Sequence, residues 1–142
     1  VESVARKIAD MAQQFTQYAG VRPFGVSLII TGAGKHGPEL FLTDPSGTYL
    51  PYNAIAIGSG SDQVTEYLEK NYNADLSLEE ACVLAAESIY LISEDKSGFD
   101  HIKMATVNMS TKQMKRLTDK EIEKFASKAK NRETKGTETK SE

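Results

Sequence analysis

The first predicted element is a one-sided helix at the beginning of the chain. Large apolar side chains recur there at spacings of four, three, four and three residues: Val4, Ile8, Met11, Phe15 and Tyr18. This period is that of one face of an α-helix, and most positions between these residues are polar. Gly20 stands where a left-handed C-terminal cap belongs. The pattern predicts a surface helix that ends near Gly20 and packs its apolar stripe on another layer.

The stretch 22–58 predicts an antiparallel meander of three strands. The first strand, 26–31, is an uncharged run whose apolar residues fall on both parities. Such a run is typical of a strand that is covered on both faces. Two further strand-like segments follow at 39–43 and 48–57, and the Gly-rich segment 32–38 predicts a hairpin between the first two. A buried antiparallel sheet is therefore expected as the core of the fold.

Proline and glycine shape the predicted ends of these strands. Pro23 is placed at the start of the first strand, where its missing N–H costs least, and Gly25 indicates a bulge or a close backbone approach. The second connection has the composition of a type I turn. Asp44 can accept backbone N–H bonds, Pro45 presets the first central φ, and Gly47 occupies the fourth position.

Two helices are predicted after the meander, because the apolar period changes beyond residue 58. Ser59 or Ser61 is available as the N-cap of the first of these helices. The second begins with a capping box, in which Ser77 and Glu80 exchange hydrogen bonds. Its apolar residues surround much of the helix up to Ile92, so we expect it to be more buried than its neighbours.

Two short strands and a closing helix complete the predicted elements. The alternation over 101–108 indicates a strand, and a second short strand is expected around 113–117. Thr118 and Glu121 form another capping box, which predicts a helix that continues to Ala129. No internal repeat is present in the sequence.

Composition places the chain among ordinary globular domains. It has 142 residues, of which 39% are hydrophobic and 26% charged, and we expect one domain over 1–130. Residues 131–142 contain no apolar side chain, so nothing repays the entropy of ordering them, and a disordered polar tail is predicted. A net charge of -3 gives no reason to expect nucleic acid as a partner.

The cysteine count and the apolar runs bear on localisation. A single cysteine, Cys82, rules out an internal disulfide framework and fits a reducing, cytoplasmic compartment. No apolar run approaches the roughly 20 residues that span a bilayer, so no membrane is expected as a partner. The chain opens at Val1 without an initiating Met, and we expect it to be a fragment.

The loop Gly58-Ser59-Gly60-Ser61 lies between a strand and a helix, where phosphate-binding loops occur. A dinucleotide fingerprint would need a glycine at Gln63, and the Gly-Lys-Ser/Thr of a P-loop is absent. The interpretation that we favour is a strand-to-helix turn with a capping serine. An anion site at this turn, within a stand-alone ligand-binding α+β domain, is kept as an alternative.

No other residues form a recognisable reaction centre. His36 and His101 are isolated from other ligand-type residues apart from Asp100, and with Cys82 they do not make a zinc site. Cys82 is interpreted as a small core residue. An N-terminal nucleophile would need Thr, Ser or Cys in place of Val1. The sequence therefore predicts no catalytic, cofactor-binding or metal-binding residue.

Three motifs together resemble the α-type subunits of the proteasome. They are the run Arg22-Pro23-Phe24-Gly25-Val26-Ser27, the turn Asp44-Pro45-Ser46-Gly47, and the segment that ends in Gly58-Ser59-Gly60. Further agreement in order and spacing extends over most of the chain from Val4 to Lys128. The first two motifs in combination are characteristic of α-type subunits, and the character of the sequence is archaeal. The residues taken as structural family motifs are Arg22, Pro23, Phe24, Gly25, Asp44, Pro45, Ser46, Gly47, Gly58 and Gly60.

This resemblance implies a fold and an assembly. The fold would be the α+β, four-layer αββα sandwich of the N-terminal nucleophile hydrolases. The protein would be a non-catalytic subunit of the 20S core particle without cofactors. It would form seven-membered rings with other α subunits and scaffold the β rings. It would also gate the channel and dock regulatory ATPases or other activators in ATP-dependent or ubiquitin-like-tag protein degradation.

The resemblance also implies what is missing from this sequence. Family members carry a gating segment, helices and a first set of strands ahead of the part matched here. The sandwich is therefore expected to be incomplete, and the chain alone is expected to be unstable or to aggregate. A β-type threonine hydrolase remains the other alternative function, and Val1 argues against it.

Overall fold

The computed structural model describes residues 1–93 and 102–138, with side chains described up to residue 130. The chain divides into two compact units, which are considered separately. One comprises Val1–Ile57 with Val107–Met114, and the other comprises Gly58–Thr106 with Lys115–Glu142. Both helices and sheets are present, which confirms the α+β class.

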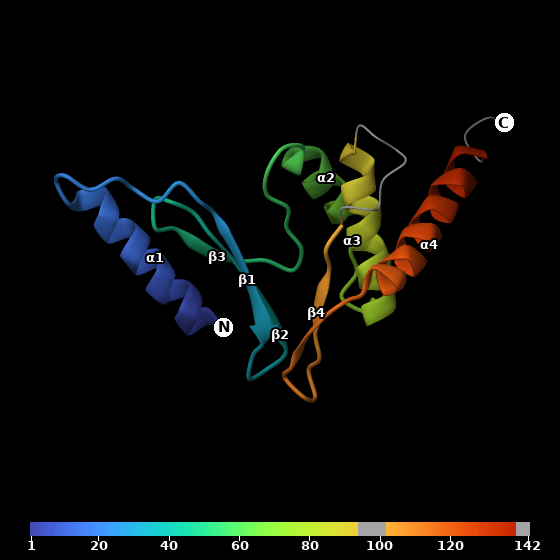
Figure 1. Cartoon of the computed structure of the whole chain (residues 1–142), viewed down its shortest axis with the longest axis horizontal. Coiled ribbons are helices and arrows are strands. Elements are labelled where there is room, and N and C mark those ends of the chain that lie inside the picture. The colour runs from blue at the N-terminus through green and yellow to red at the C-terminus, as the bar shows by residue number, and fades with distance from the viewer. Residues whose placement is uncertain (94–101, 139–142) are drawn as a thin grey trace. The chain divides into compact units, whose positions relative to one another are not determined.

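The first unit contains one helix and a three-stranded sheet of order β1-β2-β3 (Figure 1). The sheet is antiparallel throughout, with Leu28 opposite Thr43 and Thr43 opposite Tyr49. This confirms the predicted meander. Its elements are α1 (Glu2–Gln17), β1 (Leu28–Ala33), β2 (Pro38–Thr43) and β3 (Tyr49–Pro51).

Within this unit α1 covers one face of the sheet, and no described element of the unit covers the other. Phe41 and Thr43 are 8% and 2% exposed on the face toward α1. On the opposite face Ile29, Leu42 and Leu50 form one cross-strand row, and Ile29 and Leu50 remain 40% and 49% exposed. The prediction of a strand covered on both faces is therefore wrong for the part of the chain described, because α1 packs on only one face.

The buried face of α1 also differs from the prediction. Its buried residues are Ala5, Ala9 and Ala12, whereas Val4, Met11 and Tyr18 are 55%, 45% and 67% exposed. Alanine side chains let the helix approach the sheet closely, and the apolar stripe lies beside this contact. The alanines thus form the most buried part of the packing surface, and of the predicted stripe only Ile8 and Phe15 are half-buried.

The first elements begin or end at other residues than predicted, and β1 is shifted from 26–31 to Leu28–Ala33. α1 ends at Gln17, and Gly20, with φ +85°, lies in the turn beyond it. β1 begins at Leu28, so Pro23 does not open a strand and Gly25 is not in a bulge. β3 ends at Pro51, far before residue 57. The register rules out pairing with β2 as far as residue 57, because Ala54 would already face Pro38, where β2 begins.

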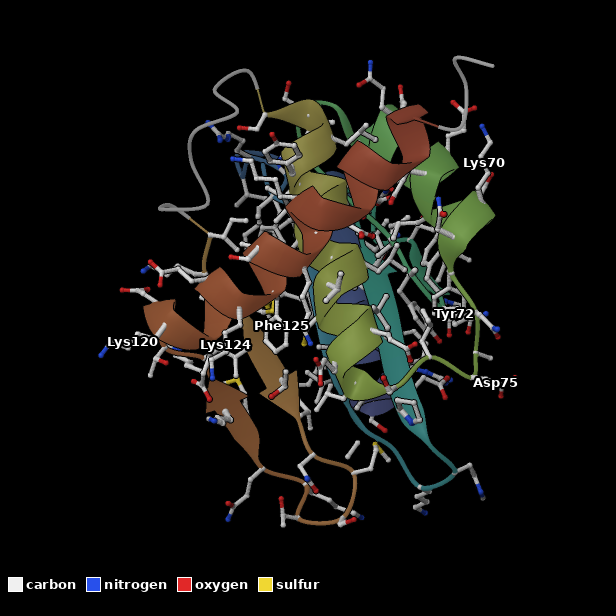
Figure 2. All side chains as sticks on the ribbon, turned by 90° about the vertical axis from the view of Figure 1, so that its right-hand side faces the viewer. Lys70, Tyr72, Asp75, Lys120, Lys124 and Phe125 are labelled. Carbon is white, nitrogen blue, oxygen red and sulfur yellow. The ribbon has the colours of Figure 1, made fainter. Side chains whose placement is uncertain are left out.

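The second unit is built around three helices (Figure 1). They are α2 (Ser61–Asn71), α3 (Leu78–Ile92) and α4 (Asp119–Glu138). α3 contacts both α2 and α4. Val83 and Ala86 of α3 meet Ala129 of α4 in a small core, against which Met104 and Phe125 pack. Figure 2 shows Phe125 between α4 and α3, whereas Lys120 and Lys124 point to solvent.

A separate two-stranded sheet is formed by β4 (Ala105–Val107) and β5 (Met114–Arg116). The second predicted strand around 113–117 is confirmed, and the first is shorter than expected. The first strand was predicted to start at residue 101, which lies outside the described residues. In the connection Lys112 adopts a positive φ of 55°, and its N–H donates to the carbonyl of Asn108 at 2.8 Å.

Both predicted capping boxes are confirmed. The Ser77 hydroxyl accepts from the Glu80 N–H, and Glu80 accepts from the Ser77 N–H at 2.9 Å. The Thr118 N–H donates to Glu121 Oε2 at 2.9 Å, and the Glu121 N–H donates back to the Thr118 hydroxyl. Each pair is satisfied within one helical turn, which explains why the motif is readable from sequence.

α4 extends further than expected. The predicted disordered tail began at residue 131, but the helix continues to Glu138. Lys, Arg and Glu have good helix propensity, so a polar segment can extend a helix without adding to the core. The last four residues lie outside the described part of the chain, where the tail stays a prediction.

Candidate functional site

The motif at 22–25 packs against the end of α1. The Phe24 ring lies 4.9 Å from the Phe15 ring, with the two planes tilted by 37°. The Arg22 side chain folds back over Gly25, where a Cβ atom would stand 3.2 Å from its Nη2 atom. Gly25 thus permits a close approach, although by a side chain and not by a strand. This motif fixes the segment between α1 and β1.

The motif at 44–47 forms the predicted tight turn. The Asp44 carboxylate accepts hydrogen bonds from the Ser46 N–H at 2.8 Å, from the Ser46 hydroxyl and from the Thr48 N–H at 3.3 Å. The Gly47 N–H donates to the Asp44 carbonyl at 3.1 Å. The Ser46 hydroxyl, with these N–H groups, lowers the pKa of Asp44. The turn is therefore held by an ionised side chain.

Gly47 is required by two independent features of this turn. Its φ is +92°, a conformation that side chains with a Cβ rarely adopt. A Cβ atom at this position would also lie 2.8 Å from the carbonyl oxygen of Ala9 and collide with Gln13. The turn between β2 and β3 thus packs closely on α1 at Ala9 and Gln13.

The third motif shapes the start of α2. Gly58 and Gly60 have φ values of +101° and +76°. Gly60 is itself the N-cap, without a side-chain cap bond, so the prediction of Ser59 or Ser61 as the cap is wrong. A Cβ atom on Gly60 would lie 2.9 Å from Ile92 at the end of α3. Gly60 is therefore selected by its backbone conformation and by helix packing.

The remaining candidate residues show no shared chemistry. His36 is exposed, as predicted, whereas His101 lies outside the described residues. Cys82 is buried, as predicted for a core residue, and burial raises the pKa of its thiol. Within 1–93 and 102–138 no three His, Cys, Asp or Glu side chains are grouped as metal ligands would be. No described helix is long and apolar enough to cross a membrane.

The family motifs are distributed over the two units. The first two both bear on α1, through Phe15 and through Ala9, and the third lies in the other unit. Sequence reasoning missed the alanine face of α1 as the partner of Gly47. Its signal was visible, because Ala5, Ala9 and Ala12 also recur at helical spacing. In this α+β scaffold the residues of the family motifs form turns and packing contacts.

Comparison with known proteins identifies the family to which this chain belongs. The family model described as "Proteasome subunit" matches residues 1–107. The chain belongs to the proteasome subunit family.

Several relatives carry the more specific name "Proteasome subunit alpha". The protein of that name from Methanothermobacter thermautotrophicus is 44% identical over 122 residues, which are 86% of this chain and 49% of the relative. The one from Archaeoglobus fulgidus is 42% identical over 132 residues, 93% of this chain and 53% of the relative. For Saccharolobus solfataricus the values are 49% over 89 residues, 63% of this chain and 37% of the relative. The chain thus spans 37–53% of the length of these three relatives.

Proposed function

We propose that this protein is a non-catalytic α-type subunit of the 20S proteasome core particle. The observation that carries the proposal is its similarity to proteins named proteasome subunit alpha, at 42% identity over 93% of the chain in one case. The combination of the motifs at 22–25 and 44–47 supports the α type in particular. These comparisons favour this function over a β-type hydrolase and over a stand-alone ligand-binding domain.

The roles of the motif residues support a structural function. The Asp44 carboxylate accepts hydrogen bonds from the backbone of its own turn. Gly47 makes the contact with α1, and Gly60 is the N-cap of α2. Residues that are used in this way shape a subunit and its surfaces. In the proposed function the peptide-bond chemistry belongs to β subunits, which carry the threonine nucleophile.

The proposed partners follow from the family. The protein assembles with other α subunits into seven-membered rings, and these rings scaffold β rings in the cytoplasm. The rings gate the channel and dock a regulatory ATPase or another activator. We propose no cofactor, nucleic acid or membrane partner for this subunit.

Assembly and chemistry can be tested together. The product of the complete reading frame that contains this sequence is purified alone, with the β subunit of the same genome, and with a β variant whose nucleophilic threonine is replaced by alanine. Negative-stain images are examined for seven-fold rings, and hydrolysis of a fluorogenic peptide is measured. We expect rings in each α-containing sample and hydrolysis only with the unmodified β subunit.

Two results would overturn the proposal. Hydrolysis by the protein alone would favour the β-type alternative, and the absence of both rings and β association would remove the assembly role. The ligand-binding alternative is tested by calorimetric titration with inorganic phosphate and with ATP. Saturable binding that is lost in a Gly60→Ala variant but kept in Gly20→Ala would favour that alternative.

A further inference from the structure

We draw no further inference here: the strongest candidate, the exposed apolar face that Val4, Met11 and Tyr18 form along α1, carries none because nothing in the described structure shows what covers it.

Discussion

A Cβ atom on Gly47 would lie 2.8 Å from the carbonyl oxygen of Ala9, so the turn between β2 and β3 touches the backbone of α1. This relationship joins a family motif to the helix that covers the sheet. It depends on two small residues, because Ala9 is 1% exposed and leaves the helix backbone open to the turn. The contact between the turn and α1 thus requires glycine at position 47 for two reasons: the left-handed backbone conformation and the absence of a Cβ atom.

Gly47→Ala is expected to destabilise the protein by about 3 kcal/mol. The substitution adds left-handed backbone strain of about 1–2 kcal/mol and overpacking of about 1–3 kcal/mol. Gly20→Ala is the matched control, since Gly20 has φ +85° but open space around its Cβ position. The measurement is the free energy of urea unfolding of the product of the complete reading frame, since the chain alone is expected to aggregate, and the control should lose only about 1–2 kcal/mol. Equal losses in the two variants would show that the contact with α1 contributes nothing.

Ser77→Ala is expected to destabilise α3 by about 1 kcal/mol, because it removes the hydroxyl that accepts from the Glu80 N–H, whereas the bond from the Ser77 N–H to Glu80 is kept. Ser61→Ala is the control, as α2 is capped by Gly60 without a side-chain bond. Its effect should stay within about 0.5 kcal/mol. Thermal unfolding followed by circular dichroism compares the two variants. A loss in Ser61→Ala as large as that in Ser77→Ala would contradict the assignment of Gly60 as the cap.

Glu121 should make stability depend on pH in the acid range. The Lys115 ammonium, at 2.5 Å, and the Thr118 N–H and hydroxyl hold the pKa of Glu121 at about 2, below its ordinary 4.5. Because the folded-state pKa is lowered, the stabilisation is complete above about pH 4.5 and is lost as pH falls toward about 2. The unfolding free energy of Glu121→Gln should therefore vary less with pH than that of the unmodified protein across this window.

The matched control for this pH dependence is Glu123→Gln, which removes the same charge from the same helix. Glu123 is exposed, and its carboxylate makes no hydrogen bond among the described residues. Urea unfolding at intervals between pH 5 and about pH 2 gives the two slopes. If both variants flatten the profile equally, the effect reflects net charge and not the bonds to Lys115 and Thr118.

Lys112→Gly is expected to stabilise the β4–β5 connection by about 0.5–1 kcal/mol. Lys112 holds a positive φ of 55°, which costs a residue with a Cβ about 1–2 kcal/mol, partly offset by the entropy that glycine loses on folding. Lys112→Ala is the control, because it removes the side chain and keeps the strain. Only the glycine variant should raise the melting temperature, and a rise with alanine instead would point to the lysine charge.

Local features of this protein were determined by its sequence. The Asp44–Gly47 turn and the two capping boxes each close hydrogen bonds within about four residues, so their residue types and spacing suffice to predict them. The meander order was likewise predictable, because turn residues separate its strands. The family motifs were also identified as structural and not catalytic from sequence alone, and that remains our proposal for the whole protein.

Tertiary structure decided what depends on distant partners. The alanine face of α1 is buried because α1 packs on β2 and β3, and the sequence period alone favoured the larger stripe of Val4 and Met11. β3 could not extend to residue 57 as predicted, because its partner strand begins at Pro38, which in this register faces Ala54. The N-cap of α2 is Gly60, where a serine was predicted. Gly60 has a left-handed backbone and lies beside Ile92 of α3, which leaves no room for a Cβ atom. In each case residues far apart in the chain set the outcome, which no local pattern encodes.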